Sequence, residues 1–437
     1  MRASRCPGAA ARTPTLLLVL VLAACHRSFD YTRTTSVGTH LLPPSAAACA
    51  LPTATPESVG LSSAALDSFA ITAKDRMSDA LVILRDGQLV GEWYFGRGDH
   101  PVNIQSISKA ITSLGVALLL DDGRIPSLDL PVGDVLPEFA SGDKRALTLS
   151  MLMNHTSGVA SGQGEGQFAG VQDIDAFVRS RPLAEPPGAV YRYSNVNAQL
   201  AAAIVEVRAG QPLATFVRDR VFVPLCITDF QWTGDAKGHT YGYSRLSLHA
   251  RDLAKLGQLV LGDGTWRGQR VISAATMRGV TDSDGGRMPF AAGNYTHFWQ
   301  VAAADSVLVD AILVEHVRAA GASASFIDAL HQFVGHTWPT AVFKAKLDTA
   351  LGTNGAWARR WYDETHGAVE PIRTRGPARV ILHSGSWGQY LIIFPATRTV
   401  VVRFADFSHP GRTSEDDAGA WGSIAQEAYD RFGKAGR

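Results

Sequence analysis

The sequence has little cysteine and no excess of charge of either sign. Its 437 residues include 4 cysteines, too few for a disulfide scaffold. Lysine and arginine number 41 against 40 aspartate and glutamate residues, and no basic run stands out. The electrostatic footprint of a nucleic-acid-binding protein is therefore missing, and we expect no nucleic acid partner.

Sequence signals for bound metals and for one common hydrolase fold are missing as well. No cluster of cysteine and histidine has the spacing of zinc ligands, and neither H-x-H-x-D nor H-E-x-x-H occurs. We therefore expect no metal and no other cofactor. The G-x-S-x-G elbow is absent too, which argues against an α/β-hydrolase.

The apolar run near the start of the chain is short. Residues 16–22 are all apolar, but a run of this length cannot span a bilayer. Arginines precede it at positions 2, 5 and 12, and small residues follow it, which is the order found in a secretory signal.

The residue after this segment is a cysteine. Leu22-Ala23-Ala24-Cys25 resembles the lipobox of bacterial lipoproteins, in which the signal is removed before a cysteine that is then acylated. The alternative is an ordinary signal peptide cut after an A-x-A-like site. We prefer the lipoprotein. Residues 1–24 are then a signal peptide and Cys25 anchors the protein to a membrane through its lipid. We expect an exported cell-envelope protein, facing the periplasm or on the outer membrane if the source is Gram-negative.

The segment after Cys25 predicts little packed structure. Residues 25–55 are rich in Ser, Thr, Pro and Ala with little periodicity, which is typical of a tether. The folded body is expected over residues 56–437. Cys49 and Cys226 would meet an oxidising compartment, where a disulfide between them is possible; two ordinary buried thiols fit the sequence at least as well.

Apolar patterns predict sheet at both ends of this body and helices between them. Residues 80–84 and 89–94 read as a hairpin turning at Asp86-Gly87, and further strands are expected at 379–383, 390–394 and 399–404. Residues 108–120 are apolar almost all round, which predicts a buried helix. The fold class is α+β: an antiparallel sheet built from both chain ends and flanked by helices, plus a mainly helical lobe.

A serine and a lysine open the predicted buried helix. Ser106-Ile107-Ser108-Lys109 places them three residues apart, on one helix face, where the lysine can act as the base that a serine hydroxyl needs. The helix N-terminus also favours negative charge on Ser106. Ser141-Gly142-Asp143-Lys144 has the same spacing but lies in a polar loop, and we interpret it as a chance match.

Two further strings follow in order along the chain. Tyr193-Ser194-Asn195 comes after a Pro-Pro-Gly turn, and His383-Ser384-Gly385 ends a predicted strand. S-x-x-K, Y-x-N and a basic residue in a K-T-G-like string form the ordered trio of the serine penicillin-recognising enzymes. The sequence resembles the class C branch of that family, with class C β-lactamases, D-Ala-D-Ala carboxypeptidases, family VIII-type esterases and 6-aminohexanoate-dimer hydrolases. Residues 152–158 and 250–257 also resemble strings of this branch.

The resemblance implies a serine hydrolase that works by acyl transfer. Ser106 would be the nucleophile, and the backbone N–H groups of Ser106 and Ser386 would form the oxyanion hole. Lys109 with Tyr193 would be the base. A cation about 4 Å away at an effective dielectric of about 20 could lower the pKa of a tyrosine from about 10 to about 7.

The remaining motif residues would bind or orient the substrate. Asn195 would orient Lys109 and a substrate amide, and His383 would hydrogen-bond Tyr193 or the substrate, with Gly385 beside it. A histidine replaces the family's lysine at position 383 and is only partly charged near neutral pH. The sequence therefore leaves open whether His383 anchors a substrate carboxylate.

A segment at about 304–378 separates the last two parts of the resemblance and is longer than the family leads us to expect. Its pattern is largely helical, and a lid over the site and a packed decoration fit it equally well.

The leading hypothesis is a hydrolase of a small-molecule ester, amide or peptide. A D-Ala-D-Ala carboxypeptidase or β-lactamase is the alternative, and a catalytically silent envelope-binding protein is a third.

Overall fold

We describe the fold from a computed structural model of the chain. The structure describes residues 36–38, 49–162, 164–281, 294–303, 306–309, 311–365, 373–375, 378–405, 424–425 and 427–433. The predicted signal peptide and Cys25 lie outside these residues.

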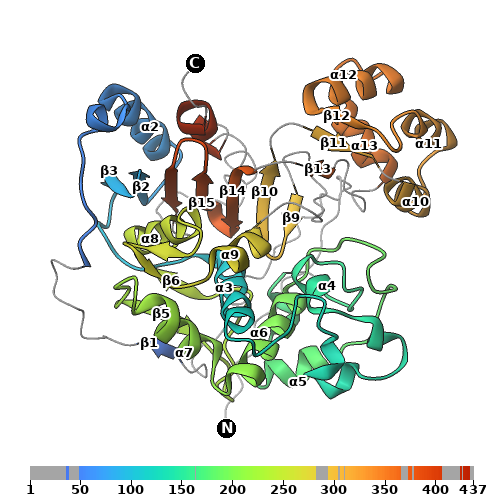
Figure 1. The fold of residues 1–437 in the computed structure, drawn as a ribbon, viewed down its shortest axis with the longest axis horizontal. Coiled ribbons are helices and arrows are strands. Elements are labelled where there is room, and N and C mark those ends of the chain that lie inside the picture. The colour runs from blue at the N-terminus through green and yellow to red at the C-terminus, as the bar shows by residue number, and fades with distance from the viewer. Residues whose placement is uncertain are drawn as a thin grey trace, which may run out of the picture. The chain divides into compact units, whose positions relative to one another are not determined.

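A seven-stranded antiparallel sheet organises the described chain (Figure 1). Its strand order is β3-β2-β16-β15-β14-β10-β9. The bounds are β2 Ala80–Arg85, β3 Gln88–Tyr94, β9 Asn294–Thr296, β10 Trp299–Ala303, β14 Ala378–Gly385, β15 Gln389–Phe394 and β16 Thr399–Phe404. Strand β2 pairs with β16, so the two ends of the body meet in one sheet, which confirms the predicted fold class.

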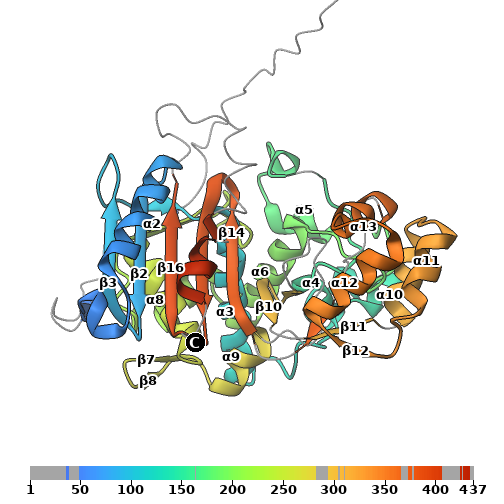
Figure 2. The same cartoon turned by 90° about the horizontal axis from the view of Figure 1, so that it is seen from above.

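Alternation along the central strands gives the sheet two buried faces. Leu81 and Ile83 of β2 pack with helix α2 (Ser63–Asp75). Val82 and Leu84 belong to the larger core on the opposite face, because successive side chains of a strand point to opposite sides. Figure 2 shows α2 in front of β3 and β2 and α8 (Ala250–Leu261) behind β2.

The predicted hairpin and the predicted helix at 108–120 are present. Asp86 and Gly87 at the hairpin turn both have positive φ, 51° and 75°, as a tight two-residue turn requires. Helix α3 runs from Ser108 to Asp121, and each residue from Ser108 to Leu119 is buried. This confirms the predicted core helix, and Ser106 lies in the turn just before it.

The helical lobe and the smaller sheets complete the described body. Within the described residues, no single helix is long and apolar enough to cross a membrane, although Asn195–Ala209 and Leu213–Phe222 pass such a test as a pair bent by 69°. The other elements are α4 Leu149–Met153, α5 Ile174–Arg179, α6 Asn195–Ala209, α7 Leu213–Val217, η7 Arg218–Phe222 and α9 Ala274–Thr281. One small sheet joins β1 Ser36–Gly38, β5 Phe230–Thr233, β6 Leu246–Leu248 and β4 Val102–Asn103, and another joins β7 Thr265–Trp266 and β8 Gln269–Arg270. Short 3-10 or π turns are η1 Pro56–Val59, η2 Gln105–Ile107, η3 Val132–Asp134, η4 Pro137–Phe139, η5 Gly142–Ala146, η6 Gly166–Phe168, η8 Ser386–Gly388 and η9 Tyr429–Gly433.

The folded body begins earlier than the tether predicted to residue 55 would allow. Cys49 forms a disulfide with Cys226, with 5.4 Å between their Cα atoms. The N–H of Leu89 in β3 donates to the carbonyl of Pro52 at 2.7 Å, and Leu51 packs against the main core. Composition alone concealed this, because a few backbone hydrogen bonds and one covalent link can hold a segment without any hydrophobic periodicity.

The insertion between β10 and β14 has a hydrophobic core of its own. It contains a sheet of β11 Ser306–Leu308, β12 Thr337–Pro339 and β13 Arg373–Arg375, and helices α10 Ala311–Ala319, α11 Ala324–His331, α12 Thr340–Leu351 and α13 Trp357–Thr365. Phe326, Leu330, Phe343 and Trp361 are among the residues buried in that core. The mainly helical pattern of the sequence is confirmed, and the segment packs on itself.

Reducing the disulfide should destabilise the body. Cys49 and Cys226 are 177 residues apart, and cross-linking a long loop restricts the unfolded chain, so we expect reduction to lower the free energy of unfolding by about 2–5 kcal/mol. Urea denaturation with and without a thiol reductant measures the effect. A Cys49→Ala/Cys226→Ala variant is the control and should unfold at the same urea concentration in both buffers. A wild-type midpoint unmoved by reductant would contradict the stabilising role.

Candidate active site

Ser106 lies in the sharp turn that leads into α3. The turn is the 3-10 helix η2, and Gln105 within it has a φ of +52°, a left-handed conformation that costs a non-glycine residue free energy. Two hydrogen bonds hold it: the N–H of Gln105 donates to Asn103 Oδ1 at 2.9 Å, and Ser108 Oγ donates to the carbonyl of Gln105 at 2.7 Å. The turn leaves Ser106 partly exposed at the start of a buried helix.

Lys109 lies below Ser106 in the core. Its Nζ is 3.1 Å from Ser106 Oγ and 2.8 Å from the carbonyl oxygen of Tyr243, and the residue has no exposed surface. Burial disfavours the ammonium form and lowers the pKa of Lys109 to about 7, although the carboxylate of Glu165 raises it in part. A lysine with such a pKa is neutral in a large fraction of molecules at neutral pH, so it can accept a proton from Ser106.

A glycine lets the chain that carries Tyr243 approach α3 and α6. A Cβ at Gly242 would lie 2.5 Å from the Ala202 Cβ and 3.1 Å from the Ala198 carbonyl oxygen, distances that packed atoms do not tolerate. Thr112, one turn after Lys109, donates to the Gly242 carbonyl at 2.7 Å. Helix α3 and this loop are thereby fixed to each other at the position where Lys109 needs an acceptor.

Tyr193 completes a group of three with Ser106 and Lys109. Its hydroxyl hydrogen-bonds Ser106, and the Lys109 Nζ lies 4.9 Å from the centre of its ring. The side chain retains 46% of its accessible surface, yet burial around the hydroxyl raises the pKa of Tyr193 above its ordinary value. This direction is opposite to the one expected from the sequence, because burial of the hydroxyl raises the pKa and the lysine lies over the ring face. Tyr193 is therefore a phenol at neutral pH, able to pass on a proton.

His155 supports the loop of Tyr193 from below. Its ring centre is 4.6 Å from that of Tyr193, and its Nδ1 accepts from the N–H of Ser194 at 3.2 Å. Nε2 therefore carries the hydrogen and donates to the Tyr295 hydroxyl at 3.1 Å. Burial and nearby Lys109 lower the pKa of His155 well below its usual value. This neutral, fully engaged imidazole positions Tyr193 and has no free atom for chemistry.

Asn195 and His383 lie in the site with one unpartnered atom each. Asn195 is the first residue of α6, and its Oδ1 is buried without a hydrogen-bond partner. The expected bond from Asn195 to Lys109 is not among the contacts of the described residues. His383 in β14 is 1% exposed, its Nδ1 lies 2.8 Å from the Ser384 carbonyl oxygen, and its Nε2 has no partner. Burial, with Lys109, lowers the pKa of His383 to about 3, so it is uncharged.

Gly385 brings the end of β14 against the chain just before Ser106. A Cβ at Gly385 would lie 2.5 Å from the Ile104 carbonyl oxygen and 2.9 Å from the Gln105 Cβ, so only glycine permits this approach. The residue after it, Ser386, is exposed and begins the turn η8. The backbones that precede Ser106 and Ser386 are thus in contact.

A buried arginine fixes that turn. Arg403 of β16 is fully buried, and its guanidinium donates to the carbonyls of Gly388 and Arg76 at 2.6 and 2.7 Å and to Ser78 Oγ at 2.8 Å. A rigid fork of donors suits three such acceptors. The turn after Gly385 is therefore held from the sheet side.

The second S-x-x-K string takes no part in the site. Ser141 is exposed and precedes η5, a short 3-10 helix that the sequence did not predict there. The Nζ of Lys144 lies 4.7 Å from the Phe139 ring centre, and no hydrogen bond between Lys144 and Ser141 occurs in this described part of the chain. A cavity of about 790 Å³ nearby is lined by residues 142, 143, 145, 146 and 183–187, none of which is a predicted site residue.

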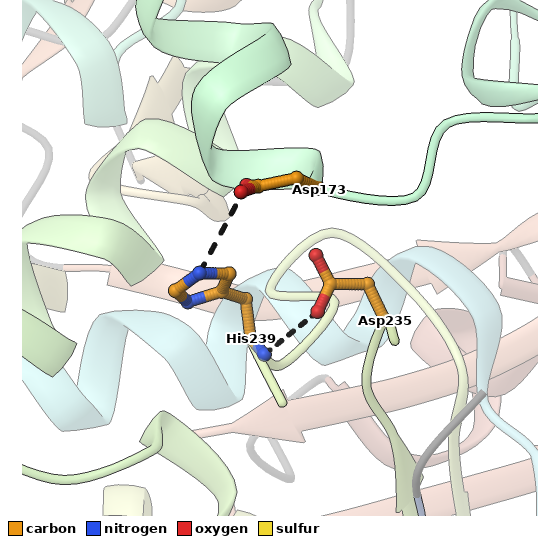
Figure 3. A group of neighbouring side chains, drawn as sticks. All are labelled: Asp173, Asp235 and His239. Atoms are coloured by element: carbon orange, nitrogen blue, oxygen red, sulfur yellow. Dashed lines mark hydrogen bonds and ion pairs between the residues drawn. The ribbon is translucent and has the colours of Figure 1, made fainter. Parts of the chain in front are cut away.

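A second group of titratable side chains surrounds His239, and Figure 3 shows part of it. The ring of His239 faces Asp173, with 3.9 Å between Nε2 and Oδ1, and its backbone N–H donates to Asp235 at 2.9 Å. On its other side Nδ1 lies 3.0 Å from Glu206 and 3.5 Å from Asp175. These ligand atoms are close enough to hold a metal ion, but the hydrogen bond to Glu206 raises the pKa of His239 to about 9. A protonated His239 already supplies the positive charge between the carboxylates and fastens its loop to α5 and α6.

Sequence reasoning missed two contributors to the electrostatics of the site. The carbonyl of Tyr243 accepts from Lys109, and a backbone carbonyl carries no residue signature. Glu165 is partly exposed, pairs with Arg245 at 3.4 Å, and acts on the pKa of both Lys109 and Tyr193. Neither residue belongs to a motif, and only the folded chain brings them near Ser106 and its partners.

Comparison with known proteins gives matches over most of the chain. The family model described as beta-lactamase matches residues 66–426. Penicillin-binding protein 4 of Amycolatopsis lactamdurans is 34% identical over 164 residues, 33% of this chain and 42% of that protein. Esterase EstB of Burkholderia gladioli is 34% identical over 153 residues, 30% of this chain and 38% of that protein. The matches therefore span less than half the length of either relative.

A solved structure shares the fold. The class C beta-lactamase from Rhodobacter sphaeroides superposes with a TM-score of 0.51 at 20% identity, covering 82% of this chain and 98% of that one. At this identity the similarity concerns the fold alone.

The pKa of Lys109 makes a testable prediction about the reactivity of Ser106. Only neutral Lys109 can accept the serine proton, so the rate of Ser106 modification by a fluorophosphonate should rise about tenfold per pH unit and level off above pH about 7. Glu165→Gln removes a charge that raises this pKa, so its midpoint should move to lower pH. A midpoint near pH 10, or a flat profile from pH 5.5 to 8.5, would show that Lys109 is not the base.

Proposed function

We propose that this chain, which belongs to the beta-lactamase family, is a serine hydrolase that cleaves an ester or amide bond through an acyl-enzyme on Ser106. The observation that carries the proposal is the contact between Ser106 Oγ and the buried Nζ of Lys109, 3.1 Å apart. A serine needs a base within this reach to become a nucleophile. The names of the two relatives, a penicillin-binding protein and an esterase, support acyl chemistry.

Acylation uses the group formed by Ser106, Lys109 and Tyr193. Neutral Lys109 accepts the proton of Ser106 as Oγ attacks the substrate carbonyl. The Tyr193 hydroxyl, which is bonded to Ser106 and protonated, donates to the leaving alcohol or amine when the carbonyl re-forms. Tyr193 then regains a proton from Lys109. The two residues thus share one proton, and their titration belongs to the pair.

The negative oxygen of the tetrahedral intermediate requires donors. We assign them to the backbone N–H groups of Ser106 and Ser386, supported by the contact of Gly385 with Ile104 and Gln105. A single donor of this kind contributes about 10²–10³ to the rate. Water, deprotonated by the Tyr193 and Lys109 pair, then attacks the acyl carbonyl and releases Ser106.

Asn195 and His383 face the substrate in this proposal, and two other functions remain as alternatives. The likeness to a penicillin-binding protein favours a D-Ala-D-Ala carboxypeptidase or β-lactamase. A neutral His383 opposes it, because the carboxylate of those substrates would find no charge there. A silent binding protein is less supported, because it has no use for a buried lysine with a pKa lowered to about 7 next to a serine.

Two serine reagents separate these functions. We expect purified wild-type protein to be labelled by a fluorophosphonate but weakly or not at all by a fluorescent penicillin, and Ser106→Ala to lose the label. Ser141→Ala is the matched control, with the same spacing to a lysine, and should be labelled like the wild type.

Other outcomes of the labelling would decide differently. Strong penicillin labelling that depends on Ser106 would favour the cell-wall branch over the esterase or amidase. Absence of any Ser106-dependent adduct with either reagent, in protein that unfolds cooperatively, would refute the hydrolase mechanism.

We also propose that the protein is an exported lipoprotein anchored through Cys25. The lipobox-like string Leu22-Ala23-Ala24-Cys25 supports this proposal. Expressed in a Gram-negative bacterium, the wild-type chain should be processed and found in the membrane fraction, and its N-terminal peptide should carry acyl chains by mass spectrometry. Cys25→Ser should release the chain from that fraction. Cleavage after a residue other than Ala24 would contradict the anchor.

A further inference from the structure

The unpartnered nitrogen of His383 has a defined chemical character. Nδ1 lies 2.8 Å from the Ser384 carbonyl oxygen, and because a carbonyl only accepts, Nδ1 carries the hydrogen. Burial and Lys109 keep the ring neutral. A neutral imidazole protonated on Nδ1 presents a lone pair at Nε2. Nε2 is thus a buried acceptor without a donor, on a side chain 1% exposed.

A second acceptor of the same kind is present in the site. Asn195 Oδ1 is also buried without a donor, on the residue that opens α6 two positions after Tyr193. Buried polar atoms in folded proteins are nearly always paired with protein, water or ligand. Two unpaired buried acceptors, one two residues after Tyr193 and one on a histidine whose pKa is affected by Lys109, are therefore complementary to a ligand that supplies donors.

The charges around the site also favour a ligand with a hydrogen-bond donor over one with a carboxylate. Lys109 is hydrogen-bonded to Ser106 and to a carbonyl, and Glu165 adds negative potential at Lys109 and Tyr193. A substrate carboxylate would face the lone pair of His383 Nε2 and find no cation reserved for it. A substrate N–H would meet an acceptor.

We infer that His383 is a specificity-determining residue that selects acyl groups bearing an N–H donor, such as a carboxamide, over acyl groups bearing a carboxylate. The inference rests on the proposed acyl-enzyme function and adds the class of substrate to it. Selection arises because a donor satisfies Nε2, whereas a carboxylate leaves it unpaired and is repelled.

Three p-nitrophenyl esters of equal chain length test this selection on the wild-type protein. Their acyl groups are succinamate, with a terminal carboxamide; hemisuccinate, with a terminal carboxylate; and pentanoate, with a terminal methyl group. Rates are corrected with Ser106→Ala protein. We expect kcat/KM for succinamate to exceed that for hemisuccinate by about tenfold or more, with pentanoate between them.

Variants at position 383 assign the preference to its side chain. His383→Lys replaces an acceptor by a cation and should reverse the ratio in favour of hemisuccinate. His383→Gln retains an acceptor oxygen and should keep the preference for succinamate. His383→Leu removes the acceptor and should bring succinamate down to the level of pentanoate. Fluorophosphonate labelling of Ser106 in each variant reports whether its site is intact.

The outcomes separate this inference from the function on which it rests. If no ester is hydrolysed in a Ser106-dependent manner, the proposed function fails. If all three are hydrolysed but wild type favours hemisuccinate, or His383→Leu keeps the wild-type ratio, the function stands and the role of His383 is refuted. Should a variant not fold, a competition experiment on the wild-type protein replaces it. An ester of succinamic acid should protect Ser106 from fluorophosphonate labelling better than a succinate monoester, which carries a free carboxylate.

Discussion

The burial of one lysine in an apolar helix governs this site. Lys109 has no exposed surface, and removal of its ammonium from water shifts its proton affinity into the neutral range. Its position also fixes the rest: the carbonyl of Tyr243 accepts from it, the Tyr193 ring lies over it, and its charge contributes to keeping His155 and His383 neutral. The surrounding core supplies the free energy that holds a polar amine in such a place.

Much of the fold was predictable, because it depends on short-range pattern. The helix at 108–120, the hairpin at Asp86-Gly87 and the three C-terminal strands each follow from periodicity or turn chemistry, and the structure contains all of them. The contact between Ser106 and Lys109 was also predictable, since residues three apart on a helix share a face. The start of the folded body before residue 55 was not predictable. The disulfide of Cys49 and the hydrogen bond from Leu89 to Pro52 leave no pattern in the local sequence.

The electrostatics of the site could not be predicted from the sequence. A motif names Tyr193 and His383 but not how deeply each atom is buried, and burial decides the direction of both pKa shifts. The tautomer of His383 depends on the carbonyl that its own strand presents. Asn195 was assigned to Lys109 by analogy, whereas a backbone carbonyl 134 residues away from Lys109 accepts instead.

The insertion between β10 and β14 is structurally separable from the sheet that it interrupts. Ala303 pairs with Ala378, so the ends of the inserted segment lie about one strand spacing apart, roughly 4.8 Å. Neighbouring antiparallel strands need only a short turn between them, and the segment carries its own core. A short turn could therefore replace the whole segment while the pairing of β10 with β14, and with it the position of His383, stays as it is.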